Sequence, residues 1–343
     1  MKEKATTSTK LFDLLDTMPD FCRSFFVGRA NERVLNTRLG YARDIKLFFD
    51  FLHDTHPHFC EMEAKDIQPG DMGAVKAEDL DKFIEIYSEK HSVRTVARMK
   101  SSISAMYSYL MNTLQAVQFN PALGAQKIKI PENDFVIYLT PEEQGMLIDS
   151  IKFGTGLSER EKKWHRRYVK RDLAMIFLFL DTGLRVSELQ GIDNHDFDLS
   201  ECSVIVARKG GSLNKVYFSD EAAGYIKDYL EEKKTMFPMF CADSDPFVIT
   251  EKGERLSVRQ IQNIVPKYVL AAIPDKAGTI SPHKLRSSFA MTFYQRDPKY
   301  GGHDLLTLQR RMNHKAITST NVYAKAAENV SKETRNWREN ISD

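Results

Sequence analysis

The sequence has few cysteines and no long apolar run. Its 343 residues include 4 Cys, none of them in a CxxC pair, which argues against a zinc module and for unpaired thiols in a reducing compartment. Residues 1–20 lack the apolar segment of a secretory signal, and no stretch approaches the length of a membrane span. We therefore expect a cytoplasmic protein that works away from membranes.

Acidic residues are absent from His91 to Pro131, although the net charge of the whole chain is only +2. The basic residues of that stretch are Arg94, Arg98, Lys100, Lys127 and Lys129. A solvated helix face is the ordinary explanation of a charge run, but the complete lack of acids favours contacts with the phosphates of a polyanion. A second basic block, at about 153–171, contains glutamates, so a solvated helix and a polyanion contact fit it equally well.

The length and the composition, 42% hydrophobic and 28% charged, predict a globular protein of two domains. Helical periodicity over 36–53, 77–90 and 92–117 indicates that the first domain is all-helical. The expected organisation is an N-terminal arm or short helix at 1–22, a helical domain at 23–126, a linker at 127–135, a second domain at 136–325 and a tail helix at 326–343.

The second domain is expected to be mostly helical with a small antiparallel sheet. Thr140-Pro141 is typical of a helix start, and the apolar run 173–180 predicts a buried helix that ends at Gly183. The helical period then changes, because 204–206 and 216–218 are typical of short strands joined by a turn at 209–212.

Residues suited to phosphate chemistry occur in short motifs. His283-Lys284-Leu285-Arg286 and Asn313-His314 precede Tyr323, and a second arginine lies in Thr182-Gly183-Leu184-Arg185-Val186-Ser187-Glu188-Leu189. Two guanidinium groups can hold the non-bridging oxygens of a phosphate, and a tyrosine supplies a hydroxyl nucleophile. Together the motifs favour an enzyme that transfers DNA strands.

These motifs, in this order, resemble the tyrosine recombinase (phage integrase) family, and the resemblance covers about residues 30–325. It implies a mainly α fold: a helical, SAM-like core-binding domain, then a mostly α catalytic domain with a small antiparallel sheet. The sequence departs from the family's pattern at Asn313, where relatives usually have Gly, and in the basic insert at 153–171.

The resemblance also implies a role for each residue. Tyr323 would attack the scissile phosphate and form a 3′-phosphotyrosine link. Arg185 and Arg286 would hold the non-bridging oxygens, while Glu188 would orient Arg185. The full expected catalytic set is Arg185, Lys209, His283, Arg286, His314 and Tyr323; the expected DNA-binding set is Arg43, Arg94, Arg98, Lys100, Lys127 and Lys129.

Lys209 would protonate the leaving 5′ oxygen, and the two histidines would assist proton transfer. A lysine beside Gly-Gly is more often a solvated turn residue, and Lys215 competes for the same role. Tyr323 alone would be read as a core tyrosine, Arg185 as a salt-bridge partner of Glu188, and each histidine as a capping or buried residue.

A metal site made of His283, His303 and His314 is the remaining alternative. No Asp, Glu or Cys falls at a ligand-like spacing beside these histidines, so we expect no metal. The phosphotyrosine link would conserve bond energy, so no ATP or other cofactor is expected either.

The function predicted from the sequence is a site-specific recombinase acting on double-stranded DNA, which would serve a bacterial mobile element. By resemblance, four copies would assemble on paired sites, with a directionality or DNA-bending factor as a possible partner. The rival functions are a type IB topoisomerase, which would relax any supercoiled plasmid, and a DNA-binding protein that has lost catalysis.

Overall fold

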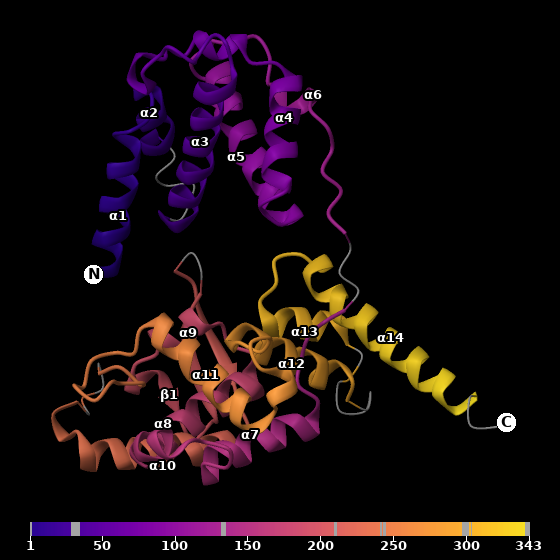
Figure 1. Cartoon of the computed structure of the whole chain (residues 1–343). Coiled ribbons are helices and arrows are strands. Elements are labelled where there is room, and N and C mark those ends of the chain that lie inside the picture. Colours follow the sequence, from indigo (N-terminus) through magenta and orange to yellow (C-terminus); the bar gives the residue numbers. More distant parts are fainter. Residues whose placement is uncertain are drawn as a thin grey trace. The chain divides into compact units, whose positions relative to one another are not determined.

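The computed structural model describes residues 2–28, 35–131, 135–208, 211–240, 242, 245–296, 302 and 304–339. The chain divides into two compact units, Met1–Glu132 and Asn133–Asp343. Figure 1 shows the helices of both units and the small sheet of the second.

Unit 1 contains only helices among its described residues. The α-helices are α1 (Lys2–Leu15), α2 (Asp20–Gly28), α3 (Leu35–Thr55), α4 (Ala77–Ser88), α5 (Val93–Asn112) and α6 (Pro121–Gly124), and two short 3-10 helices lie at Ala64–Asp66 and Asp71–Ala74. Of the arm or short helix expected at 1–22, the structure has the helix α1, whose Leu11 and Leu15 are buried against the rest of the unit. The expected boundary at residue 22 falls inside α2.

Aromatic residues fill the core of unit 1. Phe48 of α3 meets Phe83 of α4 edge-to-face, with 5.3 Å between ring centroids. Helix α5 starts because the Ser92 hydroxyl accepts a hydrogen bond from the Thr95 N–H at 3.3 Å. Its apolar residues recur every three or four positions and are buried; they are Val96, Met99, Ile103, Met106 and Leu110.

Unit 2 combines helices with one sheet. Its helices are α7 (Pro141–Phe153), α8 (Glu159–Thr182), α9 (Val186–Gly191), α10 (Asp220–Met236), α11 (Val258–Ala272), α12 (Pro282–Tyr294), α13 (Leu305–Met312) and α14 (Thr318–Glu339). The strands β1 (Phe197–Asp198), β2 (Ser203–Ala207) and β3 (Leu213–Tyr217) pair antiparallel in that order. The expected turn residues Lys209 and Gly210 lie outside the described residues.

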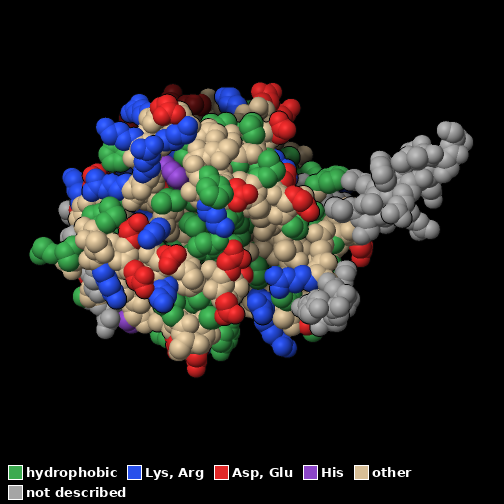
Figure 2. Space-filling view, turned by 90° about the horizontal axis from the view of Figure 1, so that it is seen from below, with side chains coloured by type: hydrophobic (Ala, Val, Ile, Leu, Met, Phe, Trp, Pro, Cys, Tyr) green, Lys and Arg blue, Asp and Glu red, His purple; other side chains and the backbone are tan. Residues whose placement is uncertain are grey.

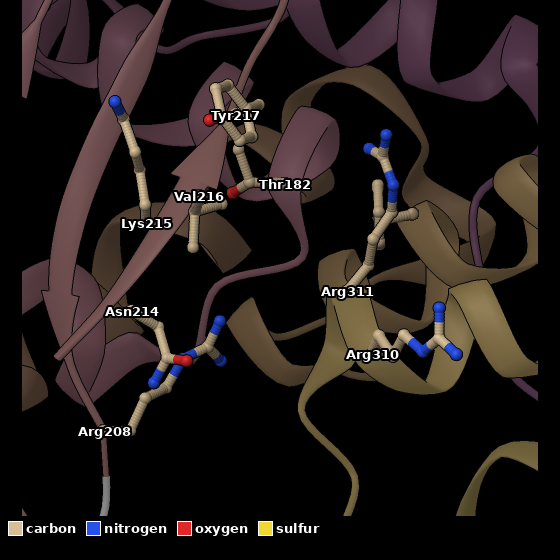
Figure 3. A pocket seen from close by; sticks show the side chains of 9 residues that line it. Thr182, Arg208, Asn214, Lys215, Val216, Tyr217, Arg310 and Arg311 are labelled. Atoms are coloured by element: carbon tan, nitrogen blue, oxygen red, sulfur yellow. The ribbon is translucent and has the colours of Figure 1, made fainter. Parts of the chain in front are cut away.

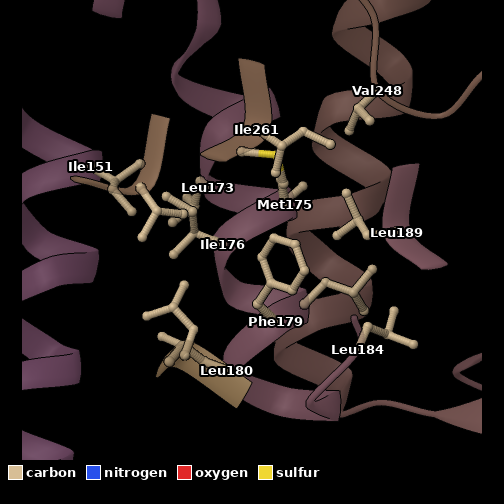
Figure 4. Packing of buried hydrophobic residues seen from close by; sticks show 14 of the residues in the cluster. Ile151, Leu173, Met175, Ile176, Phe179, Leu180, Leu184, Leu189, Val248 and Ile261 are labelled. Carbon is tan, nitrogen blue, oxygen red and sulfur yellow. The ribbon is translucent and has the colours of Figure 1, made fainter. Parts of the chain in front are cut away.

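Helix α8 forms the centre of unit 2. It is longer than the apolar run 173–180 alone predicts, since Ser158 and Glu161 form a capping box that starts the helix at Glu159. Its second half is buried, and α7, α10 and α12 pack on it. Figure 4 shows Met175, Ile176 and Phe179 inside this core.

A separate apolar cluster joins α12, α13 and α14. Phe289 and Phe293 of α12 pack with Leu308 and Met312 of α13 and with Tyr323 of α14. This cluster therefore brings together the three helices in which the C-terminal motifs lie.

Candidate active site

The first arginine lies in the sharp turn between α8 and α9. Helix α8 ends at Gly183, whose φ of +64° is a left-handed conformation that favours glycine. A Cβ at this position would come within 2.4 Å of Phe289 Cδ1. Arg185 then becomes the N-cap of α9, and Glu188 completes the capping box three residues later. The motif at 182–189 thus ends α8 at Gly183 and starts α9 after Arg185.

Glu188 holds Arg185 in place. Its Oε2 accepts from the Arg185 backbone N–H at 2.8 Å, and its Oε1 accepts from Arg185 Nη1 at 2.8 Å. Arg185 Nη2 also donates to the Asn313 carbonyl at 3.3 Å. The Glu188 side chain is buried, whereas that of Arg185 is 38% exposed, so the guanidinium keeps a face for a ligand. The salt bridge considered as an alternative to catalysis exists and serves as the arginine's support.

Arg286 of α12 is buried beneath the same turn. Nη1 donates to the Gly183 carbonyl and Nη2 to the Met312 carbonyl, so this side chain ties the end of α8 to the end of α13. Burial, and after it the charge of Arg185, lowers the pKa of Arg286 to about 10. The group remains charged at neutral pH, and the site holds two guanidinium groups close together.

Asn313 ends α13 in a left-handed conformation, with φ +46° and ψ +53°. Asparagine is the non-glycine residue that best tolerates this region. The departure from the family's glycine is therefore accommodated by the same backbone geometry. The turn places His314 directly after the helix.

Both histidines lie in the cluster of cationic side chains. His314 Nδ1 is 2.9 Å from the hydroxyl of Thr320, which is fully buried. Burial, followed by Arg286 and Arg185, lowers the pKa of His314 to about 4. Burial and the neighbouring Lys284 and arginines also lower the pKa of His283. Each imidazole is therefore neutral at pH 7.

Tyr323, in the second turn of α14, stacks on the His314 ring, with centroids 6.4 Å apart and planes 14° apart. Burial raises the pKa of Tyr323, while a hydrogen bond with Ser287 and the charge of Arg286 act in the opposite direction. The Ser287 hydroxyl itself donates to the His283 carbonyl at 3.4 Å. Ser287 is a site residue that the sequence motifs did not indicate.

Comparisons with known proteins show the family to which the chain belongs. The model of the phage integrase family matches residues 162–329. Tyrosine recombinase XerC of Caldanaerobacter subterraneus subsp. tengcongensis is 30% identical over 297 residues, which cover 84% of this chain and 77% of the relative. The chain belongs to the tyrosine recombinase family.

Further similarities extend over nearly the whole chain. Tyrosine recombinase XerS of Lactococcus lactis is 26% identical, covering 84% of this chain and 86% of its own. In fold, the chain resembles the XerH recombinase bound to difH, with a TM-score of 0.64 and 18% identity over 92% of this chain and 86% of that one. The Tn1549 transposon integrase in complex with transposon right end DNA gives 0.64 and 19%, over 92% and 99%. The predicted family, fold class and site-specific recombinase function are confirmed.

The hairpin of this tyrosine recombinase is described except at its tip. Lys209, the expected general acid, lies outside the described residues. The competing Lys215 is in β3, opposite Ile205, and its amine pairs with Glu201. Lys215 therefore has an acidic partner within the hairpin region.

Part of the basic block at 153–171 is paired within unit 2, while Arg160, Lys163 and Arg166 are exposed. Lys162 bonds Glu159 at 2.8 Å, Arg167 bonds Glu251 at 2.5 Å, and Lys170 lies 3.8 Å from Glu232. On the face of the molecule seen from below, basic and acidic side chains are intermixed (Figure 2). These contacts favour the solvated helix over a polyanion surface for this block.

No group of three His, Cys, Asp or Glu that could hold a metal is found among the described residues, and His303 lies outside them. In the same part of the chain, no helix is both long and apolar enough to cross a membrane.

The pKa of His314 predicts a pH dependence of stability. The pKa of about 4 in the folded protein lies below the ordinary 6.5. Between these two pH values, His314 therefore binds a proton more readily in the unfolded chain than in the folded one. The contribution of His314 to the free energy of unfolding is full above about pH 6.5 and is lost as the pH falls toward 4. We expect His314→Gln to flatten the fall of the urea midpoint between these pH values. A slope equal to the wild type's would contradict this, and His53→Gln, at an exposed histidine, is the control.

Proposed function

We propose that this recombinase cuts and rejoins one DNA strand at a time through Tyr323. The phenolic oxygen would form a bond to the scissile phosphorus as the bond from phosphorus to the 5′ oxygen breaks, leaving a 3′-phosphotyrosine and a free 5′ hydroxyl. The phenolic proton would leave through a neighbouring imidazole, and Lys209 would protonate the 5′ oxygen. Attack by a 5′ hydroxyl from another strand would reverse the reaction and restore Tyr323.

One observation carries this proposal: Arg185, the pair His283 and Arg286, His314 and Tyr323 lie on four separate segments, yet their side chains act on one another. The charge of Arg286 acts on Tyr323, and the charges of Arg185 and Arg286 act on His314. Two fixed cations beside a nucleophilic hydroxyl are what a developing phosphorane charge requires. A core tyrosine would not require this concentration of buried positive charge.

The histidines would become better proton acceptors when phosphate binds. Their pKa values are lowered in part by Arg286 and Arg185. A phosphate held by those guanidinium groups offsets their positive charge, so the pKa of each imidazole would rise toward its ordinary value. The site would therefore take up the phenolic proton more readily with DNA in place.

Unit 1 offers exposed cations for the DNA backbone. Arg43, Arg94, Lys127 and Lys129 are all exposed, which supports their proposed role as phosphate contacts. Arg98 instead pairs with the buried Asp44, and Lys100 donates to the Ala125 and Gln126 carbonyls at 2.9 and 2.7 Å. The proposed role of these last two residues is therefore combined with a structural one.

Two alanine variants separate these roles. We expect Lys127→Ala to lower the slope of log affinity against log salt by about one unit, whatever the DNA sequence. Arg98→Ala would leave Asp44 buried with Ser102 as its remaining partner, at a cost of about 1–3 kcal/mol in the free energy of unfolding. Salt titrations of binding and urea unfolding measure the two effects, and an unchanged slope for Lys127→Ala would dismiss that contact.

The assembly and the cellular role are further parts of the proposal. The second half of α14 extends away from the other helices of unit 2 (Figure 1), which suits contact with another copy in a tetramer on paired sites. The phosphotyrosine conserves the energy of the phosphodiester, so rejoining needs no ATP. Service to a bacterial mobile element, a cytoplasmic location and an accessory DNA-bending factor stay predictions from the sequence.

The polarity of the covalent link tests the proposed reaction. The substrate is DNA flanking the gene's own locus, nicked near candidate sites so that cleavage cannot reverse, and labelled at either the 5′ or the 3′ end of the cut strand. We expect only the 5′-labelled fragment to remain on the denatured protein, with a free 5′ hydroxyl on the other fragment. Retention of the 3′-labelled fragment would contradict a 3′-phosphotyrosine.

A further inference from the structure

The residue after β2, Arg208, is buried beside the candidate site and belongs to no motif. Its side chain is 4% exposed, and Glu188 is the acid with which it pairs. Figure 3 shows it at the root of the hairpin, lining a pocket of about 140 Å³ across from Arg310 and Arg311 of α13. The burial of a charged arginine next to the candidate site suggests that it has a role in the chemistry of that site.

We propose that Arg208 is a positioning residue that acts on Arg185 through Glu188. The inference rests on the proposed strand cleavage and adds to it a residue from the hairpin. Arg208 Nη1 donates to Glu188 Oε1 at 3.1 Å and to Oε2 at 3.2 Å. The same two oxygens accept from the side chain and the backbone of Arg185 at 2.8 Å each.

Four hydrogen bonds therefore converge on one buried carboxylate. With both oxygens engaged from both sides, the carboxylate cannot rotate without breaking several bonds at once. Removal of Arg208 would leave Glu188 bound to Arg185 alone and free to follow it. The orientation of Arg185 toward a phosphate would then be lost.

The charge of Arg208 is a second reason to expect that it supports the action of Arg185. Glu188 is a full negative charge beside the guanidinium that must attract phosphate, and alone it would cancel much of that attraction. Arg208 supplies a compensating positive charge from the hairpin side. The cluster of Arg185, Glu188 and Arg208 then keeps a net positive charge, which Arg286 increases.

The main chain of Arg208 fixes its position. Its N–H donates to the Ser212 carbonyl at 2.8 Å, and its carbonyl accepts from the Gly211 N–H at 2.9 Å. These bonds close the turn between β2 and β3. The side chain therefore reaches Glu188 from a backbone position that two hydrogen bonds hold.

Arg208→Met is the direct test, because it removes the charge and keeps most of the side-chain volume. We expect the rate of covalent adduct formation to fall at least about tenfold on a nicked site, with DNA affinity within about twofold of the wild type's. Arg208→Lys keeps the charge but loses the guanidinium geometry, so its rate should lie between the two. Arg208→Lys also tests the proposal if Arg208→Met does not fold.

A neutral substrate separates positioning from folding. Replacing one non-bridging oxygen of the scissile phosphate by a methyl group removes the charge that Arg185 would offset, so losing the clamp should matter less. We expect the ratio of wild-type to Arg208→Met rates to fall at least about fivefold on this methylphosphonate, as it should for Arg185→Met.

Arg255→Met is the matched control. Arg255 holds the other end of α9 through the Gln190 and Ile192 carbonyls at 2.8 and 3.0 Å, so its loss loosens the helix without touching Glu188. The ratio of the wild-type rate to the Arg255→Met rate should be the same on the ordinary phosphate and on the methylphosphonate. An equal ratio for Arg208→Met on both, or a wild-type rate, would overturn the positioning role. A wild type that forms no adduct on any site would overturn the proposed cleavage itself, and this role with it.

Discussion

Arg286→Ala is expected to slow covalent adduct formation by at least about two orders of magnitude, as removal of a preorganised charge does. DNA binding should stay close to that of the wild type, since the exposed cations of unit 1 and Arg185 remain. Two effects combine in this variant: a charge beside the phosphate is lost, and the Gly183 and Met312 carbonyls lose their donor. Single-turnover cleavage on a nicked site measures the rate of adduct formation, and the affinity for DNA is measured in parallel.

Arg286→Lys distinguishes the two effects. A lysine restores the charge but cannot donate to both carbonyls in the fixed geometry of a guanidinium. We expect it to recover part of the cleavage rate. Near-normal cleavage by Arg286→Ala would instead show that the residue is structural, and the two-cation account of the site would be wrong.

Gly183→Ala is expected to destabilise unit 2 and to abolish cleavage together. A non-glycine residue at φ +64° costs about 1–2 kcal/mol, and the added Cβ would meet Phe289 Cδ1 at 2.4 Å, an overlap that adds about 1–3 kcal/mol. Because Arg185 follows this turn and Arg286 binds its carbonyl, a shift here displaces both cations. Urea unfolding and adduct formation measure the two losses.

Gly278→Ala is the control for backbone strain alone. Gly278 also has a positive φ, +74°, but a Cβ there would have nothing within 4 Å. We expect Gly278→Ala to lose only the free energy of unfolding that the backbone strain costs, about 1–2 kcal/mol, and to retain cleavage. If the two variants lost equal stability, the contact with Phe289 would be insignificant, and the close packing of α8 against α12 would not explain why this turn has a glycine.

The fold could be predicted largely because local signals agreed with the tertiary structure. The apolar spacing of Val96, Met99 and Ile103 matches the buried face of α5, and the strand period around Val204 matches β2. Where a segment is polar, the local signal is weaker. The sequence left open whether the segment before 173 is a solvated helix or a polyanion contact, because the ion pairs of Arg167 and Lys170 join segments far apart in sequence.

The site could be predicted as a set of residues but not as a network. Short motifs specify Arg185 and Glu188 because a helix stop and a capping box are local features. Arg208 and Ser287 are site residues through contacts between segments far apart in sequence. Likewise, nothing in the sequence around Arg98 of α5 indicates that its partner is Asp44 of α3.

The central claim is that the Tyr323 hydroxyl forms the covalent bond to DNA. The most direct measurement incubates the wild type and Tyr323→Phe with the same nicked sites in chelator, then separates protein from DNA under denaturing conditions. We expect an adduct with the wild type alone, while both proteins bind the DNA equally well. An adduct of equal yield with Tyr323→Phe would contradict the account, because another residue would then be the nucleophile.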